Sequence, residues 1–141
     1  MQIKLQKKQN SDFEYVAENH LGHQVELCNS SMENPSSASP MELVLMAISG
    51  CSSIDIVHIL KKQNLVIEDL QVETLGTRKE TEPKVFTVID LLVKLKGEIP
   101  AKKALRAAQL SFEKYCSVSK MLDQTVEIKY QVELNGNLIE V

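Results

Sequence analysis

Residues 39–62, SPMELVLMAISGCSSIDIVHILKK, form the stretch of the sequence that decides the fold. Ser39 is a good N-cap, Pro40 suits the first helical position, and Glu42 stands three residues after the serine, where it completes a capping box. The residues that follow, as far as about residue 62 or 63, are apolar on nearly every face of a helix. We therefore expect a long central helix that protein surrounds on most sides.

The same segment has nearly the length of a membrane span. Asp55, His58 and several serines interrupt it, however, and ionisable residues are costly inside a bilayer. We expect a core helix of a water-soluble protein and no membrane as partner.

The flanking segments predict strands before this helix and a mixture of strands and helices after it. Three short alternating runs precede it, a hairpin follows it, and a second helix and a short helical turn lead to a last strand. The expected elements are strands within residues 1–28, strands at 65–79 and 84–96, a helix from Pro100 to about Tyr115, a helical turn at 117–122, and a strand at 125–134.

This order of elements predicts an α+β fold formed by one domain over residues 1–141, in which antiparallel sheets wrap a long central helix. One small sheet cannot cover such an apolar helix on all its sides. A second copy of the chain is the simplest way to finish burying it, so we expect a homodimer.

Charge and the N-terminal sequence exclude several kinds of partner and location. The 16 Lys and Arg and 19 Asp and Glu leave a net charge of -3, which gives no electrostatic reason to expect nucleic acid or an anionic membrane as partner. The first residues contain no apolar block followed by a small-residue cleavage site, so we predict a cytoplasmic protein.

The chain has three cysteines, Cys28, Cys51 and Cys116, with no CxxC motif and no His/Cys pair at zinc spacing. This spacing predicts neither a metal site nor a cofactor. In a reducing cytoplasm such thiols are either inert core residues or redox-active. Cys116 stands just before a predicted helical turn, and this position predicts a lowered thiol pKa, whereas Cys51 in mid-helix has no such help.

If Cys51 is a nucleophile, a cation from elsewhere in the fold must stabilise its thiolate. No Lys or Arg lies within nine residues of it on either side. The candidates are a histidine or one of four basic residues, Arg78, Lys79, Arg106 and Lys120.

Two further features around Cys51 each leave two interpretations open. Asp55 and His58 share its helix face, so they form either a Cys/Asp/His row or ordinary hydrogen bonds where the helix meets a loop or its twin. A seven-residue offset spans about 10 Å of helix axis, which is too far for direct proton transfer from Cys51 to His58. The small residues beside Cys51 leave room for either a packed helix or a substrate.

Residues 39–62 together with LSFEKYCSVSKML at 110–122 resemble the two cysteine motifs of the OsmC/Ohr superfamily, the osmotically inducible and organic-hydroperoxide-resistance proteins. LGHQVEL, TRKETEPKVFTVIDL and the terminal strand are also similar in kind and order, so the resemblance covers essentially the whole chain. It implies an OsmC-like fold and an intertwined homodimer, in which sheets of both subunits enclose two long helices and the active sites lie at the interface.

The resemblance also implies thiol-dependent reduction of organic hydroperoxides. Cys51 would attack the O–O bond as a thiolate and become a sulfenic acid, and Cys116 would condense with it to a disulfide that a dithiol reductant resets. The partners implied are the second copy of the chain, a small hydroperoxide and this reductant.

Two residues expected in such a peroxidase are missing. The superfamily's peroxidases carry an activating arginine in the N-terminal region and a glutamate ten residues before the first cysteine. This chain has no arginine in that region and has Met41 at the glutamate position, while the capping box already accounts for Glu42. The pattern resembles the less characterised OsmC-like branch, in which Arg78 or His23 would supply the missing polarity.

These departures keep enzymatic activity an open question and leave an alternative. The same fold would then be a binding protein with weakly reactive thiols, which takes an apolar or electrophilic ligand in a pocket at the dimer interface. A different thiol chemistry, such as persulfide handling, is a third hypothesis.

Overall fold

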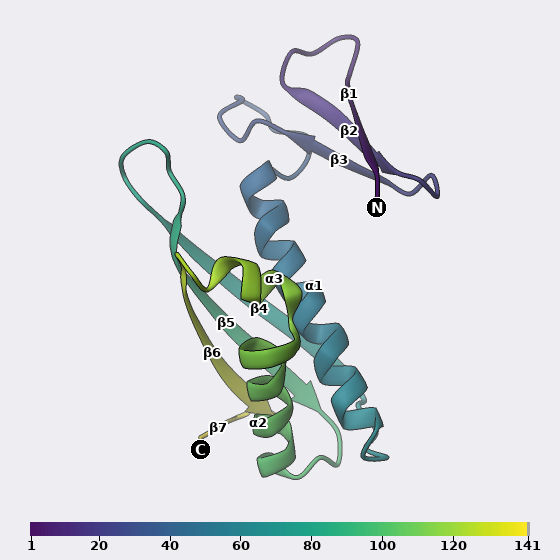
Figure 1. Ribbon diagram of the computed structural model, residues 1–141, viewed down its shortest axis with the longest axis vertical. Coiled ribbons are helices and arrows are strands. Elements are labelled where there is room, and N and C mark those ends of the chain that lie inside the picture. The colour runs from purple at the N-terminus through teal and green to yellow at the C-terminus, as the bar shows by residue number, and fades with distance from the viewer. Residues whose placement is uncertain (141) are drawn as a thin grey trace. The chain divides into compact units, whose positions relative to one another are not determined.

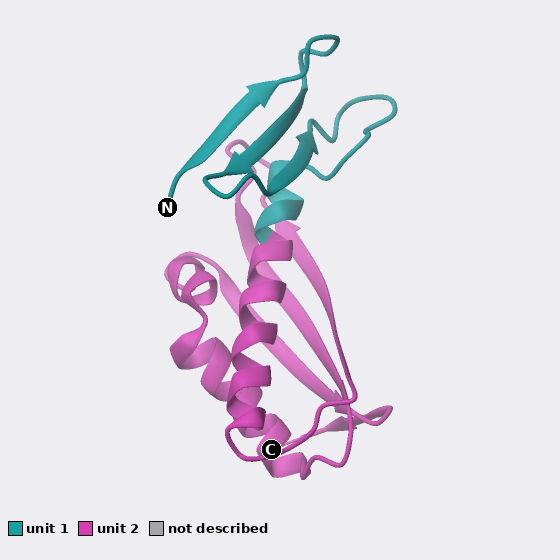
Figure 2. Ribbon diagram, turned by 90° about the vertical axis from the view of Figure 1, so that its right-hand side faces the viewer, with its two compact units in different colours: residues 1–44 teal, residues 45–141 magenta. Residues whose placement is uncertain are grey.

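The computed structural model describes residues 1–140 and divides into two compact units, residues 1–44 and the residues from 45 onward (Figures 1 and 2). Helix α1 (Pro40–Lys61) begins in unit 1 and continues into unit 2. The predicted α+β fold class and the predicted order of strands and helices are confirmed. The single domain stays a prediction.

Unit 1 contains an antiparallel sheet with the strand order β1 (Ile3–Lys7), β2 (Glu14–Asn19) and β3 (Gln24–Cys28). Leu5 and Val25 both stand opposite Ala17, so their side chains share one face of this sheet. They are 58% and 50% exposed, respectively. The sheet therefore has an apolar face that unit 1 itself leaves open.

The predicted capping box is confirmed at the start of α1. The Ser39 N–H donates to Glu42 Oε2 at 2.7 Å, and the Glu42 N–H donates to Ser39 Oγ at 3.3 Å. The hydrogen bond from the Ser39 backbone also lowers the pKa of the Glu42 carboxyl. Glu42 thus has a structural role at the helix N-terminus, as the sequence indicates.

Unit 2 contains a four-stranded sheet in the order β4-β5-β6-β7, with β4 (Asp69–Arg78) and β5 (Phe86–Lys96) as an antiparallel hairpin. The remaining strands are β6 (Glu127–Leu134) and β7 (Asn137–Ile139). Alternate side chains of β5 are fully or almost fully buried, namely Ile89, Leu91, Val93 and Leu95. Strand β5 is therefore the centre of the unit 2 core.

One strand pair departs from the predicted antiparallel sheets, because β5 and β6 run parallel. Helix α2 (Ala101–Leu110), the π-helical turn η1 (Ser111–Tyr115) and helix α3 (Ser117–Leu122) lie between these two strands in the chain. A crossover of this length returns the chain to the end of the sheet from which β5 started, so the next strand runs in the same direction.

Helix α1 packs in unit 2 between the sheet and the crossover. Ser49 Oγ lies 2.7 Å from Thr74 Oγ1 of β4, and Ser111 Oγ of η1 donates to the Ser52 carbonyl at 3.3 Å. The buried residues of α1 are Ile48, Ser52, Ile56 and Leu60, which recur every four positions and so form one stripe.

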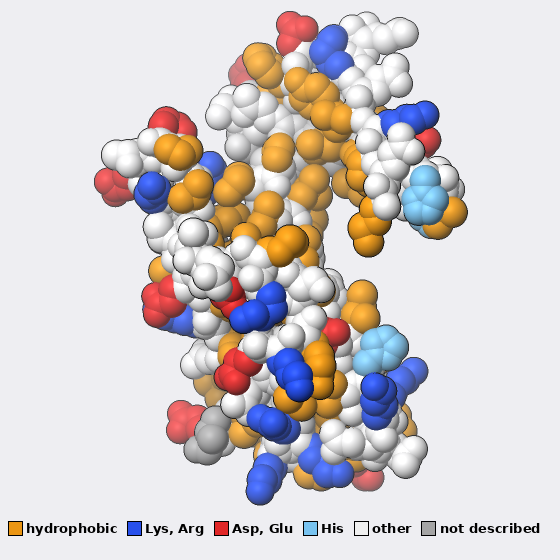
Figure 3. All heavy atoms as spheres, in the orientation of Figure 1, with side chains coloured by type: hydrophobic (Ala, Val, Ile, Leu, Met, Phe, Trp, Pro, Cys, Tyr) orange, Lys and Arg blue, Asp and Glu red, His pale blue; other side chains and the backbone are white. Residues whose placement is uncertain are grey.

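The opposite side of α1 is open within the single chain. Met46 is 55% exposed and Ile54 is 60% exposed, and Figure 3 shows hydrophobic side chains at the surface of both units. By length and composition alone, α1 would also be able to span a membrane. The single chain thus does not surround the helix on most sides, and the predicted second copy stays a prediction.

Candidate functional site

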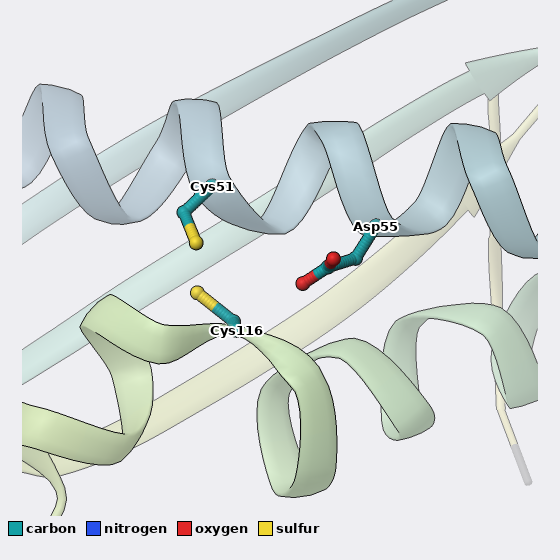
Figure 4. Close-up of side chains that lie close together, drawn as sticks. All are labelled: Cys51, Asp55 and Cys116. Atoms are coloured by element: carbon teal, nitrogen blue, oxygen red, sulfur yellow. The ribbon is translucent and has the colours of Figure 1, made fainter.

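The two cysteines singled out in the sequence face one another in unit 2. The Sγ atoms of Cys51 and Cys116 and a carboxylate oxygen of Asp55 all lie within 4.8 Å of one another, and Figure 4 shows the three side chains pointing into one space. Both cysteines are free thiols. We call Cys51, Asp55 and Cys116 the thiol cluster.

The π-helical turn places Cys116 in this cluster. The Cys116 N–H donates to the Ser111 carbonyl at 2.8 Å, across five residues, and the chain then leaves the helix with extended backbone at Cys116. Cys116 is the N-cap of α3, and its Sγ accepts a hydrogen bond from the Ser119 N–H at 3.4 Å. Single π-helical turns of this kind occur frequently at functional sites.

The environment of the Cys116 thiol contradicts the prediction of a lowered pKa. Cys116 is fully buried, and this burial raises the pKa of its thiol to about 11. The hydrogen bond from Ser119 lowers the pKa, but by less than burial raises it. The prediction is wrong because the loss of hydration disfavours the thiolate more than the start of a short helix favours it.

Asp55 joins the thiol cluster, whereas His58 does not. The Ser111 hydroxyl lies 3.4 Å from Asp55 Oδ2, so it is positioned to donate to this oxygen as well as to the Ser52 carbonyl. His58 is exposed and lies outside the cluster. The Cys/Asp/His row is therefore not formed. The structure instead groups Cys51 and Asp55 of α1 with Cys116 at the N-terminus of α3.

The basic residues proposed as activators make hydrogen bonds elsewhere. Arg78 Nε donates to the Lys84 carbonyl at 2.5 Å, Arg106 donates to Gln109 at 2.7 Å, and Lys120 pairs with Asp123. Lys79 is exposed in the connection between β4 and β5.

His23 belongs to the β2–β3 turn of unit 1, where its Nδ1 lies 3.2 Å from Asn19 Nδ2. Among residues 1–140, no basic side chain donates a hydrogen bond to the thiol cluster.

Sequence reasoning found both thiols but missed the importance of two of their neighbours. Asp55 is the one acid in the apolar interior of α1, and an isolated acid in such a run indicates a polar contact inside the fold. Ser111 carries no recognisable signal, because only the fold brings it to Asp55. Two thiols and a carboxylate at this spacing are able to form a disulfide or to hold a metal ion.

Comparison with known proteins assigns the family. The family model described as OsmC-like protein matches residues 33–131. Protein YhfA of Escherichia coli K12 is 39% identical over 121 residues, which cover 85% of this chain and 89% of YhfA.

Among solved structures, a hypothetical protein from Aquifex aeolicus is 28% identical with a TM-score of 0.84, and the match covers 95% of each chain. An organic hydroperoxide resistance protein OsmC from Legionella pneumophila shares the fold, with 19% identity and a TM-score of 0.71 over 93% of this chain and 94% of that one. The sequence match and these shared structures agree, and this chain belongs to the OsmC-like family.

Proposed function

We propose that this protein is a thiol-dependent hydroperoxide reductase in which Cys51 reacts with the peroxide and Cys116 resolves the product. The observation that carries the proposal is the convergence of two free thiols from distant parts of the sequence to within 4.8 Å. Membership of a family whose structural neighbours include organic hydroperoxide resistance proteins supports it.

The two thiols differ in the way that this division of roles requires. Cys51 is half-buried, so a peroxide can reach it, whereas Cys116 is fully buried. Burial also raises the pKa of Cys116 to about 11, so its thiol is protonated at neutral pH and is a poor first nucleophile. Cys51 is therefore the thiol assigned to the peroxide.

The chemistry proceeds in three balanced steps. The Cys51 thiolate attacks one peroxide oxygen, the O–O bond breaks, and the alkoxide leaves and takes up a proton as an alcohol, which leaves Cys51 as a sulfenic acid. The Cys116 sulfur then attacks the Cys51 sulfur, the S–O bond breaks, and water leaves as the disulfide forms. A dithiol reductant restores both thiols by exchange and is itself oxidised to a disulfide.

A second candidate function is a binding protein with weakly reactive thiols. It is favoured by the absence, among residues 1–140, of a basic side chain bonded to the thiol cluster, and by the exposed apolar residues Met46 and Ile54 on α1. The apolar character of α1 in the sequence also predicts a second copy of the chain. A second copy would cover these residues, and an apolar or electrophilic ligand would bind at the interface.

One titration separates the two functions. Reduced wild-type protein, Cys51→Ser, Cys116→Ser and the matched control Cys28→Ser are each treated with one equivalent of cumene hydroperoxide in the presence of a metal chelator. Free thiols and intact mass are then measured. We expect wild type and Cys28→Ser to form one disulfide, Cys116→Ser to accumulate a sulfenic or overoxidised Cys51, and Cys51→Ser to form no disulfide. Wild-type thiols that survive prolonged exposure would contradict the reductase and favour the binding protein.

A further inference from the structure

The thiol cluster presents three possible metal ligands from two directions. Cys51 and Asp55 lie four residues apart on one face of α1, and Cys116 approaches from the N-terminus of α3 (Figure 4). Their donor atoms lie within 4.8 Å of one another. In a tetrahedral zinc site, neighbouring sulfur and oxygen ligands lie roughly 3.6–3.8 Å apart. Side-chain rotations that draw the donors together by about 1 Å are enough to reach this spacing.

The charge of the cluster favours a cation. The cluster combines one carboxylate with two thiols, and each of these groups is able to coordinate a divalent cation. No basic side chain among residues 1–140 donates a hydrogen bond to Cys51, Asp55 or Cys116. A bound divalent cation would reverse this situation, because a thiol that coordinates such an ion is deprotonated outright. Asp55 is thus well placed to be the third ligand.

Neighbouring groups already orient two of the three ligands. The Ser111 hydroxyl is within reach of Asp55 Oδ2 at 3.4 Å, and the Ser119 N–H donates to Cys116 Sγ at 3.4 Å. Ser111 and Ser119 are themselves buried. Hydrogen bonds of this kind, made to the ligands and not to the metal, are a regular feature of metal sites in proteins.

From these observations we propose that the reduced protein binds one thiophilic divalent cation, of which Zn²⁺ is the representative, through Cys51, Cys116 and Asp55. Two sulfur ligands select such an ion over Mg²⁺ or Ca²⁺. Three protein ligands leave the fourth tetrahedral position to water, and binding releases the two thiol protons. The proposal does not depend on peroxidase activity. Oxidation of the pair to a disulfide would remove two of the three ligands, so only the reduced protein would bind.

Cobalt is the probe that reports the ligands directly. The reduced, full-length protein is titrated with Co²⁺ without oxygen or peroxide, and Zn²⁺ is then added. We expect a thiolate-to-cobalt charge-transfer band and the visible bands of tetrahedral Co²⁺, both saturating at one equivalent and lost when Zn²⁺ displaces the cobalt. The absence of these bands from the reduced wild type would overturn the proposal.

Variants identify the ligands. Because each removes a donor, Cys51→Ser, Cys116→Ser and Asp55→Asn are each expected to weaken binding by at least about 10–100-fold. The control Cys28→Ser should leave binding unchanged, because the Cys28 thiol donates to the Ser37 carbonyl at 3.0 Å and lies in unit 1. A second control, His58→Ala, tests an exposed neighbour on the same helix. Undiminished binding in Asp55→Asn, or binding lost in His58→Ala, would contradict the assigned ligand set.

A measurement on wild type avoids any dependence on the folding of the variants. Iodoacetamide is added to the reduced protein with and without Zn²⁺, and the alkylated cysteines are identified by mass spectrometry. Zn²⁺ is expected to slow alkylation of Cys51 by at least about tenfold, since a metal-bound thiolate is shielded from the reagent. Equal alkylation with and without Zn²⁺ would overturn the metal site and would leave the peroxide titration, performed with chelator, unaffected.

Discussion

The sheet of unit 1 and the sheet of unit 2 differ in how much apolar surface they remove from water. In strands β1–β3 only Cys28 is buried, and Ile3 is 64% exposed. In strand β5, by contrast, every second residue from Ile89 to Leu95 is buried. Because hydrophobic stabilisation grows with the apolar area buried, unit 2 holds most of the chain's own core.

The difference shows where the single chain leaves apolar surface uncovered. The apolar face of a sheet has to be buried against another element, and α1 leaves Met46 and Ile54 exposed as well. Both features support the predicted second copy of the chain. Asp55 and His58 within the apolar α1 favour a core helix over a membrane span.

The cysteines of the two units also differ in their surroundings. Cys28 in unit 1 is buried, and its thiol donates to the Ser37 carbonyl at 3.0 Å. Cys51 and Cys116 in unit 2 face one another beside a carboxylate. A buried cysteine becomes a candidate for chemistry only when the fold brings a second reactive group to it.

The largest effect is expected from a charge placed on the exposed side of α1. Ile54→Asp should convert the predicted dimer fully to monomer, because burying an unpaired carboxylate in an apolar interface is costly. Sedimentation equilibrium measures the change, and Lys61→Asp at the exposed end of the same helix is the control. A wild-type monomer, or a dimer that Ile54→Asp leaves intact, would refute the role of this surface.

The next effect compares the same residue type in the two sheets. Ile89→Ala in β5 should lower the free energy of unfolding by about 2–5 kcal/mol, because it leaves a cavity in the core. Ile3→Ala should cost less than about 1 kcal/mol at low protein concentration, where only the single chain contributes. Urea unfolding followed by circular dichroism gives both values. Equal losses of unfolding free energy in the two variants, at every protein concentration, would contradict the difference in burial between the two sheets.

The pH dependence of stability tests the burial of Cys116. Its pKa is raised to about 11 from an ordinary value of 9.0, so the folded state binds more protons than the unfolded chain between these values. The contribution of Cys116 is fully present below pH 9 and is lost as the pH rises toward 11. Between pH 8 and pH 10.5, wild type should therefore lose more stability than Cys116→Ala. Equal losses of unfolding free energy in the two proteins would show that the pKa of the Cys116 thiol is not raised by folding.

The smallest effect concerns the start of α1 in unit 1. Ser39→Ala should lower the free energy of unfolding by about 1 kcal/mol, because it removes the N-cap acceptor of the Glu42 N–H. Ser30→Ala, in the exposed loop before the helix, is the matched control and should be nearly neutral. Chemical denaturation measures both, and equal values would mean that the cap contributes nothing to stability.

Much of this fold was predictable, because its strongest signals are local. The capping box and the apolar run of residues 39–62 predicted α1 to within about two residues at its C-terminal end. The parallel pairing of β5 with β6 was not predictable in the same way, since the choice of neighbouring strand depends on where α2 packs. The π-helical turn at Ser111–Tyr115 also leaves no periodic signal in so short a segment.

The sequence by itself determined the α+β order of elements, the start of α1 and the two cysteines of the site. Hydrophobic periodicity, capping residues and the two motifs each depend only on residues that are close together in the sequence. Only the tertiary structure decided that Asp55 and not His58 lies beside the thiols, and that the pKa of Cys116 is raised and not lowered. Both depend on burial and on contacts between α1 and the crossover. These arise only when distant segments pack together, and desolvation then outweighs the local helix dipole.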